Sequence, residues 1–97
     1  MKNEFKRTLT VTDPSGEKSI TLNIIDEKTM RIVNPNSRAE IGEIKIGDGG
    51  EVNFNPIGDY RWPEDAGKCL LECSRGCNGD LWCVAECAAM CSTIIIG

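Results

Sequence analysis

Apolar and polar residues alternate through most of residues 1–55, and this period of two is typical of β-strands that bury one face. The first alternating segment, "FKRTLTVT", places Phe5, Leu9 and Val11 among polar residues. Clusters rich in Gly, Pro, Asn and Asp separate the segments and supply the turns. The pattern predicts five short strands in a small antiparallel β-meander, at 5–12, 19–25, 29–33, 40–46 and 51–54.

The last third of the chain has the features of helices rather than strands. Residues 56–63, "PIGDYRWP", form a joint that disfavours both regular structures, and Tyr60 and Trp62 can anchor it to either half. Pro63 suits the first position of a helix, and the two acidic residues after it complement the helix dipole. We therefore expect an α+β chain with a β-rich region at 1–55 and a cysteine-rich helical hairpin at 64–97.

All six cysteines lie between residues 69 and 91, in two sets with a spacing of four residues. In a helix this spacing keeps side chains on one stripe, which drifts by about 40° per step. Asn78 and Gly79 between the sets can end a helix, and Asp80 can cap the next one. Two antiparallel helices joined here would bring the stripes face to face. Six cysteines allow many connectivities, but the mirror symmetry of the spacing favours the disulfides Cys69–Cys91, Cys73–Cys87 and Cys77–Cys83.

A helical wheel divides the side chains that flank the cysteines into an apolar side, with Leu70 and Val84, and an acidic side, with Glu72 and Glu86. The apolar side can pack on the β-rich half as part of a core. It can also face a membrane or a partner protein. The second interpretation gives a candidate surface made of Leu70, Trp82, Val84, Ile94, Ile95 and Ile96.

The amino-acid composition excludes several kinds of binding and catalytic sites. The 97 residues include 15 acidic and 11 basic ones, and the net charge of −4 argues against a nucleic-acid surface. There is no histidine, so a Cys–His pair, a serine triad and a mixed Cys/His zinc site are excluded. No CxxC motif is present either. We predict no enzyme activity, catalytic residue, cofactor or resident metal, with a thiolate cluster for Cu(I) or Zn²⁺ as an alternative.

The cysteines and the N-terminal sequence point to different compartments. Clustered cysteines suggest an oxidising destination. However, "MKNEFKRTLTVTDPSG" lacks the apolar segment of a secretory signal, and the longest aliphatic run is Ile94-Ile95-Ile96. We expect synthesis in the cytoplasm followed by export through a route other than general secretion.

The CxxxC repeats "CLLECSRGC" and "CVAECAAMC" resemble the core of ribosomally made, cysteine-crosslinked peptide precursors such as bacteriocins and sactipeptide-like products. In those families a leader precedes the core, and a peptidase-containing ABC transporter cuts after a double glycine during export. The resemblance implies an antimicrobial precursor that is cut after Gly49 and Gly50 and acts, once secreted, on a target membrane or receptor.

The sequence allows alternatives for the double glycine, for the crosslinks and for the function. The double glycine is part of "GDGG" at 47–50, which also fits a hairpin turn between two strands. The crosslinks can be disulfides or enzymatic thioethers. The chain can also be a non-enzymatic binding or structural module, in which the sheet supplies the interaction surface and the cysteines only clasp the fold.

Overall fold

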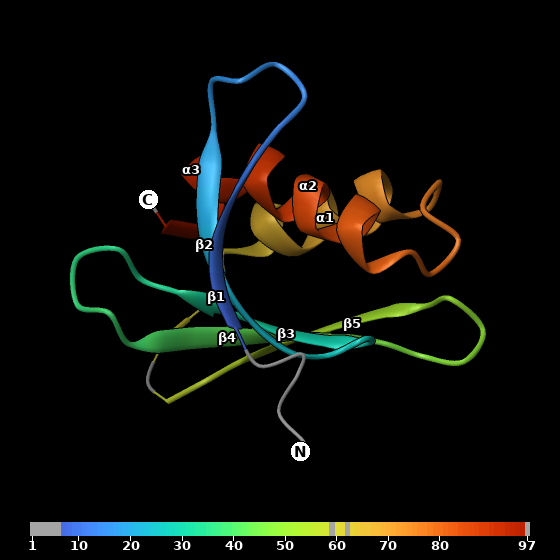
Figure 1. Ribbon diagram of the computed structural model, residues 1–97, viewed down its shortest axis with the longest axis horizontal. Coiled ribbons are helices and arrows are strands. Elements are labelled where there is room, and N and C mark those ends of the chain that lie inside the picture. The colour runs from blue at the N-terminus through green and yellow to red at the C-terminus, as the bar shows by residue number, and fades with distance from the viewer. Residues whose placement is uncertain (1–6, 59, 62, 97) are drawn as a thin grey trace.

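The structure is a computed structural model that describes residues 7–58, 60, 61 and 63–96 (Figure 1). Five strands come first: β1 (Arg7–Thr12), β2 (Ser19–Asp26), β3 (Thr29–Val33), β4 (Glu40–Ile46) and β5 (Val52–Pro56). Three helices follow: α1 (Glu64–Ser74), α2 (Leu81–Met90) and α3 (Ser92–Ile96). Phe5 and Trp62, which the sequence assigns to the first strand and to the joint, lie outside the described residues.

The strands form one antiparallel sheet in which each strand pairs with the next in sequence. The predicted α+β class with a five-stranded antiparallel sheet is therefore confirmed. The register places Ile24, Met30, Ile44 and Phe54 opposite one another across four strands. Because side chains that pair across strands share a face, this row makes one face of the sheet apolar.

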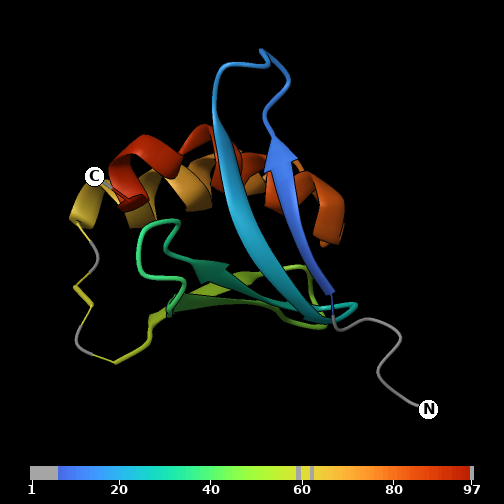
Figure 2. The same cartoon turned by 60° about the vertical axis from the view of Figure 1, so that its left-hand side comes forward.

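All three helices lie on this apolar face (Figure 1). The sheet is strongly bent, so β1 and β2 stand beside α2 while β3, β4 and β5 run beneath the helical layer (Figure 2). The fully buried side chains come from both layers and include Leu22, Ile32, Leu70, Val84 and Ile95. Sheet and helices therefore share one hydrophobic core.

The opposite face of the sheet is polar. Thr8, Asn23, Arg31 and Glu43 follow one another in register from β1 to β4. The Thr8 hydroxyl donates a hydrogen bond to Asn23. Arg31 donates to Glu43 over 3.2 Å and to Glu40 over 3.4 Å. Cross-strand pairs of this kind stabilise a sheet locally, and the figures show no helix over this face of the described chain (Figure 2).

Two boundaries differ from the sequence-based expectation, and a short third helix was not predicted. Pro63 is the N-cap of α1 with an extended backbone (φ −62°, ψ 143°), so the helix begins one residue later than predicted. β5 begins at Val52 and extends to Pro56, because Glu51 belongs to the preceding turn. The aliphatic residues after Cys91 belong to this helix, α3.

Adjacent leucines in α1 provide a test of the shared core. Leu70 is 0% exposed, whereas Leu71 is 45% exposed. We expect Leu70→Ala to lower the free energy of unfolding by about 2–5 kcal/mol, because it leaves a cavity between helix and sheet. Leu71→Ala, with the same change in chemistry, is expected to cost less than about 1 kcal/mol. Urea unfolding of the oxidised variants measures both values. Equal losses would contradict a core shared between α1 and the sheet.

Candidate functional site

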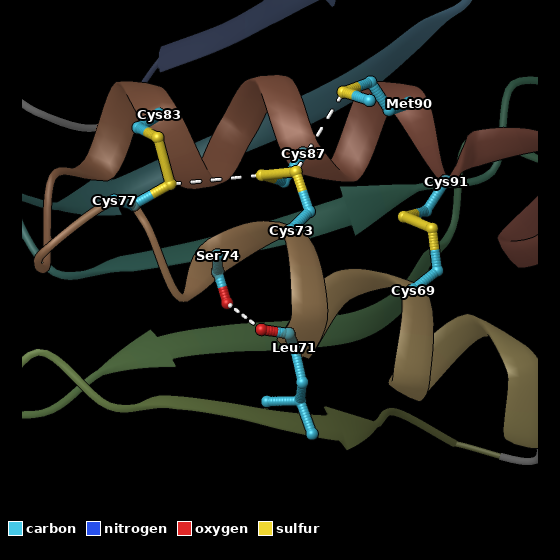
Figure 3. The surroundings of a disulfide bond; sticks show 9 residues. All are labelled: Cys69, Leu71, Cys73, Ser74, Cys77, Cys83, Cys87, Met90 and Cys91. Carbon is cyan, nitrogen blue, oxygen red and sulfur yellow. Dashed lines mark hydrogen bonds between the residues drawn. A yellow bond between two sulfur atoms is a disulfide. The ribbon is translucent and has the colours of Figure 1, made fainter.

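The six cysteines join α1 and its C-terminal turn to α2 and the residue that follows it (Figure 3). The three disulfides are Cys69–Cys91, Cys73–Cys87 and Cys77–Cys83, with S–S distances of 1.98, 2.05 and 2.10 Å. These are the same pairs that the mirror spacing favours. Their Cα–Cα separations of 6.0, 5.7 and 5.4 Å are ordinary for disulfides. No cysteine of the chain is left free.

Two of the disulfides touch each other. Cys77 Sγ lies 3.9 Å from Cys87 Sγ, although these sulfurs belong to different bridges. Cys73 Sγ lies 3.9 Å from Met90 Sδ (Figure 3). The buried Cys77 and Cys87 face the core, while Cys73 and Cys83 are partly exposed. The result is a small sulfur-rich cluster that solvent reaches from one side.

The apolar side of the two helices is covered by the sheet. Leu70, Val84 and Ile95 are each 0% exposed, so they cannot belong to an outward surface of the folded chain. The prediction that they face a membrane or partner is wrong for this state, and the alternative of packing on the β-rich half is correct. Ile94 and Ile96 are only partly buried against the core.

A different set of apolar side chains is exposed. Trp82 is 52% exposed, as the sequence-based surface requires. Met90, 43% exposed, was not predicted, although it lies eight residues after Trp82 on the same stripe of α2. The acidic Glu86 lies between them on that stripe. Within the described residues, no helix has the length and apolar character needed to cross a bilayer.

Gly49 and Gly50 lie in the turn that joins β4 to β5. The Gly47 N–H donates to the Glu51 carbonyl over 2.7 Å, and the Gly50 N–H donates to the Gly47 carbonyl over 3.0 Å. Gly50 has φ +86°, which suits glycine far better than other residues. "GDGG" is therefore a hairpin turn in the folded chain, whether or not it is also a processing site.

This turn also touches the turn between α1 and α2. A Cβ added to Gly79 would lie 3.3 Å from Gly50 Cα, and one added to Gly50 would lie 3.5 Å from Gly79 N. Both glycines have positive φ, +86° and +83°. The backbones of the two turns thus lie in close contact, and a side chain at Gly79 would crowd Gly50. This contact places the double glycine close to Cys77–Cys83, the tip of the disulfide ladder.

The shifted pKa values have structural causes. An ion pair with Asp48 at 3.0 Å raises the pKa of Lys28, and burial raises the pKa of Tyr60. Burial also raises the pKa of Asp13, but hydrogen bonds from Ser15 and from backbone N–H groups of the same turn outweigh it, so this pKa is lowered overall. None of these shifts is by itself the sign of a catalytic group.

Because the bridges are nested, we can predict how much each one contributes to the free energy of unfolding. The paired cysteines are 22, 14 and 6 residues apart, so each outer bridge adds a loop of about eight residues to the bridge inside it. By loop entropy, losing the Cys69–Cys91 bridge then costs about 2.5 kcal/mol. Losing Cys77–Cys83 costs roughly 1.7 kcal/mol, because Cys73–Cys87 must then close a loop of 14 residues. An isolated loop of the outer length would contribute about 3.4 kcal/mol.

Cys69→Ala/Cys91→Ala and Cys77→Ala/Cys83→Ala form a matched pair, because each variant removes one buried and one partly exposed sulfur. Unfolding in urea without reductant measures the two losses. A loss for the outer bridge that exceeds the inner one by several kcal/mol would show that the bridges do not act as a nested ladder.

No protein-family model, no curated protein and no solved structure matches this chain. Its function is therefore inferred from its own residues. The features available for that purpose are the cluster of disulfides, the glycine turn beside it, the exposed stripe on α2 and the polar face of the sheet.

Proposed function

We propose that the protein is a non-enzymatic, bacteriocin-like peptide precursor in which strands β1 to β4 mask the apolar side of a disulfide-linked helical hairpin. One observation carries this proposal: α2, which holds the fully buried Val84, packs against β1 and β2, and both strands precede Gly50. A cut after Gly50 would separate this cover from all six cysteines. It would also expose the apolar side chains that the resemblance assigns to a membrane or receptor.

We assign the cut to a peptidase-containing ABC transporter that acts before the disulfide bridges form. In the folded chain, Ile46 pairs with Val52 and Lys45 pairs with Asn53 on the two sides of the turn. Gly50 also packs against the turn between α1 and α2. A peptidase needs an extended segment of backbone, so these contacts protect the site. In the reducing cytoplasm the bridges are open, and the fold lacks the stability that they add. The segment therefore opens for cleavage more often than it does in the oxidised chain.

The order of cleavage and folding can be measured on protein from the native host. We expect the culture medium to contain a species that begins at Glu51 and takes up six alkyl groups only after reduction. Intact mass with thiol alkylation, before and after reduction, detects it. A full-length species with six free thiols as the only product in cells and medium would refute export and processing. Crosslinks that survive reduction would refute the disulfide form of the product.

Masking predicts a difference in activity between the chain and its fragment. Oxidised 51–97 is expected to release dye from anionic liposomes at micromolar concentration, because apolar side chains such as Val84 lose their cover. The oxidised full-length chain is expected to be inert at the same dose. Val84→Ser in the fragment provides the control, and it should weaken leakage if the unmasked side acts. If the fragment retains its helices and bridges but releases no dye, the proposal that it acts on membranes is wrong.

A second candidate function has its own observation. The polar face of the sheet carries an ordered row from Thr8 to Glu43, and Arg31 is held there between two carboxylates. This face suits a binding module in which the helices only clasp the sheet. Circular dichroism of isolated 1–55 separates the two candidates. A sheet that folds alone favours the binding module, whereas a disordered fragment beside an oxidatively folded 51–97 favours the precursor.

A further inference from the structure

The sulfur atoms near the tip of the ladder are arranged in a way that disulfide bonding alone does not require. The Sγ atoms of Cys77, Cys83 and Cys87 all lie within 4.8 Å of one another, although they come from two different bridges. Cys73 Sγ is bonded to Cys87 Sγ at 2.05 Å and lies at the edge of this group. The two bridges thus place three sulfurs close together and a fourth beside them, and we call these the four-sulfur cluster.

The spacing between the two bridges matches the spacing of sulfurs around one metal ion. Sulfurs bound to one tetrahedral Zn²⁺ at about 2.3 Å lie about 3.8 Å from each other. The Cys77 and Cys87 sulfurs already lie 3.9 Å apart. Opening the bridges at 2.05 and 2.10 Å lets each bonded pair separate to this distance through side-chain rotation, while the helices keep their positions.

We propose that reduction of Cys73–Cys87 and Cys77–Cys83 converts these two disulfides into a four-thiolate site for one soft cation, Zn²⁺. Four equivalents of a thiol, RSH, reduce the two bridges to four protein thiols and release two RSSR. Zn²⁺ then displaces the four thiol protons, which pass to solvent. The site does not depend on export or on cleavage at Gly50.

Two features of the scaffold favour the site after reduction. Ala66 and Leu70 of α1 and Val84 and Ala88 of α2 remain packed against the sheet, so the helices stay in place without the inner bridges. Cys91 is fully buried in the core at the far end of the ladder, outside the four-sulfur cluster. A partly preformed site costs less to order than one assembled from an unfolded chain.

The chemistry of the donors selects the cation. The chain has no histidine, and an all-thiolate set favours Zn²⁺ or Cu(I) over harder ions. The Met90 thioether 3.9 Å from Cys73 adds a polarizable neighbour on the partly exposed side. Four thiolates match the tetrahedral preference of Zn²⁺, and we therefore assign Zn²⁺ as the occupant.

The test uses the full-length chain, reduced anaerobically with a water-soluble phosphine and titrated with Zn²⁺ against a chromophoric chelator. Cys77→Ala/Cys83→Ala removes two of the proposed ligands. Cys69→Ala/Cys91→Ala, the matched control, removes two cysteines outside the cluster. We expect one Zn²⁺ per chain in the wild type and in the control, and an affinity lower by about 100-fold or more in the first variant. Co²⁺ bound to the wild type should show the visible spectrum of a tetrahedral all-sulfur site.

Any of the following three outcomes would overturn the proposal. Equal affinities in the two double variants would mean that any pair of thiols binds the metal adventitiously. Loss of binding in the Cys69→Ala/Cys91→Ala variant alone would place the site at the other end of the ladder. If the reduced wild type lacks helical circular dichroism and Zn²⁺ does not restore it, the four sulfurs do not form a site on this fold.

Discussion

The apolar side of α1 and α2 and the apolar face of the sheet cover each other, and the rest of the structure depends on this contact. Each fully buried side chain of leucine size, such as Leu22, Leu70 and Val84, contributes about 1.5–3 kcal/mol through burial. Most of these side chains would lose their cover if the layers separated. The disulfides cannot replace the contact, because they join helix to helix and leave the sheet unbridged.

Much of this arrangement can be predicted from the sequence. Alternation identifies the strands, because a period of two is typical of strands that bury one face and does not fit a helix, and the mirror spacing selects the same three cysteine pairs that the structure contains. A helical wheel also puts Leu70 and Val84 on the same side of the two helices, but it cannot say whether this side faces the sheet or solvent. That choice depends on the bend of the sheet, which comes from long-range packing.

In the candidate site, too, some features can be predicted from the sequence and others depend on the fold. The sequence singles out the double glycine and the cysteines separately, and nothing in their spacing brings them together. The close approach of Gly50 to Gly79 arises only when the sheet folds against the helices. The approach of Cys77 to Cys87 arises only when α1 and α2 pack together. Likewise, Met90 can be recognised as an exposed apolar residue only once the exposed side of α2 is known. Contacts between segments far apart in the chain are therefore what the sequence leaves undetermined.

The nested order of the bridges also has a consequence for the path of oxidation. The innermost pair, Cys77 and Cys83, is only 6 residues apart and needs the smallest loop closure. Once it has formed, the next pair outward has only a short loop left to close, and the same is true again for the outermost pair. Oxidation from the tip toward the base is therefore the entropically shortest route, and each correct bridge lowers the chance that the remaining cysteines pair wrongly.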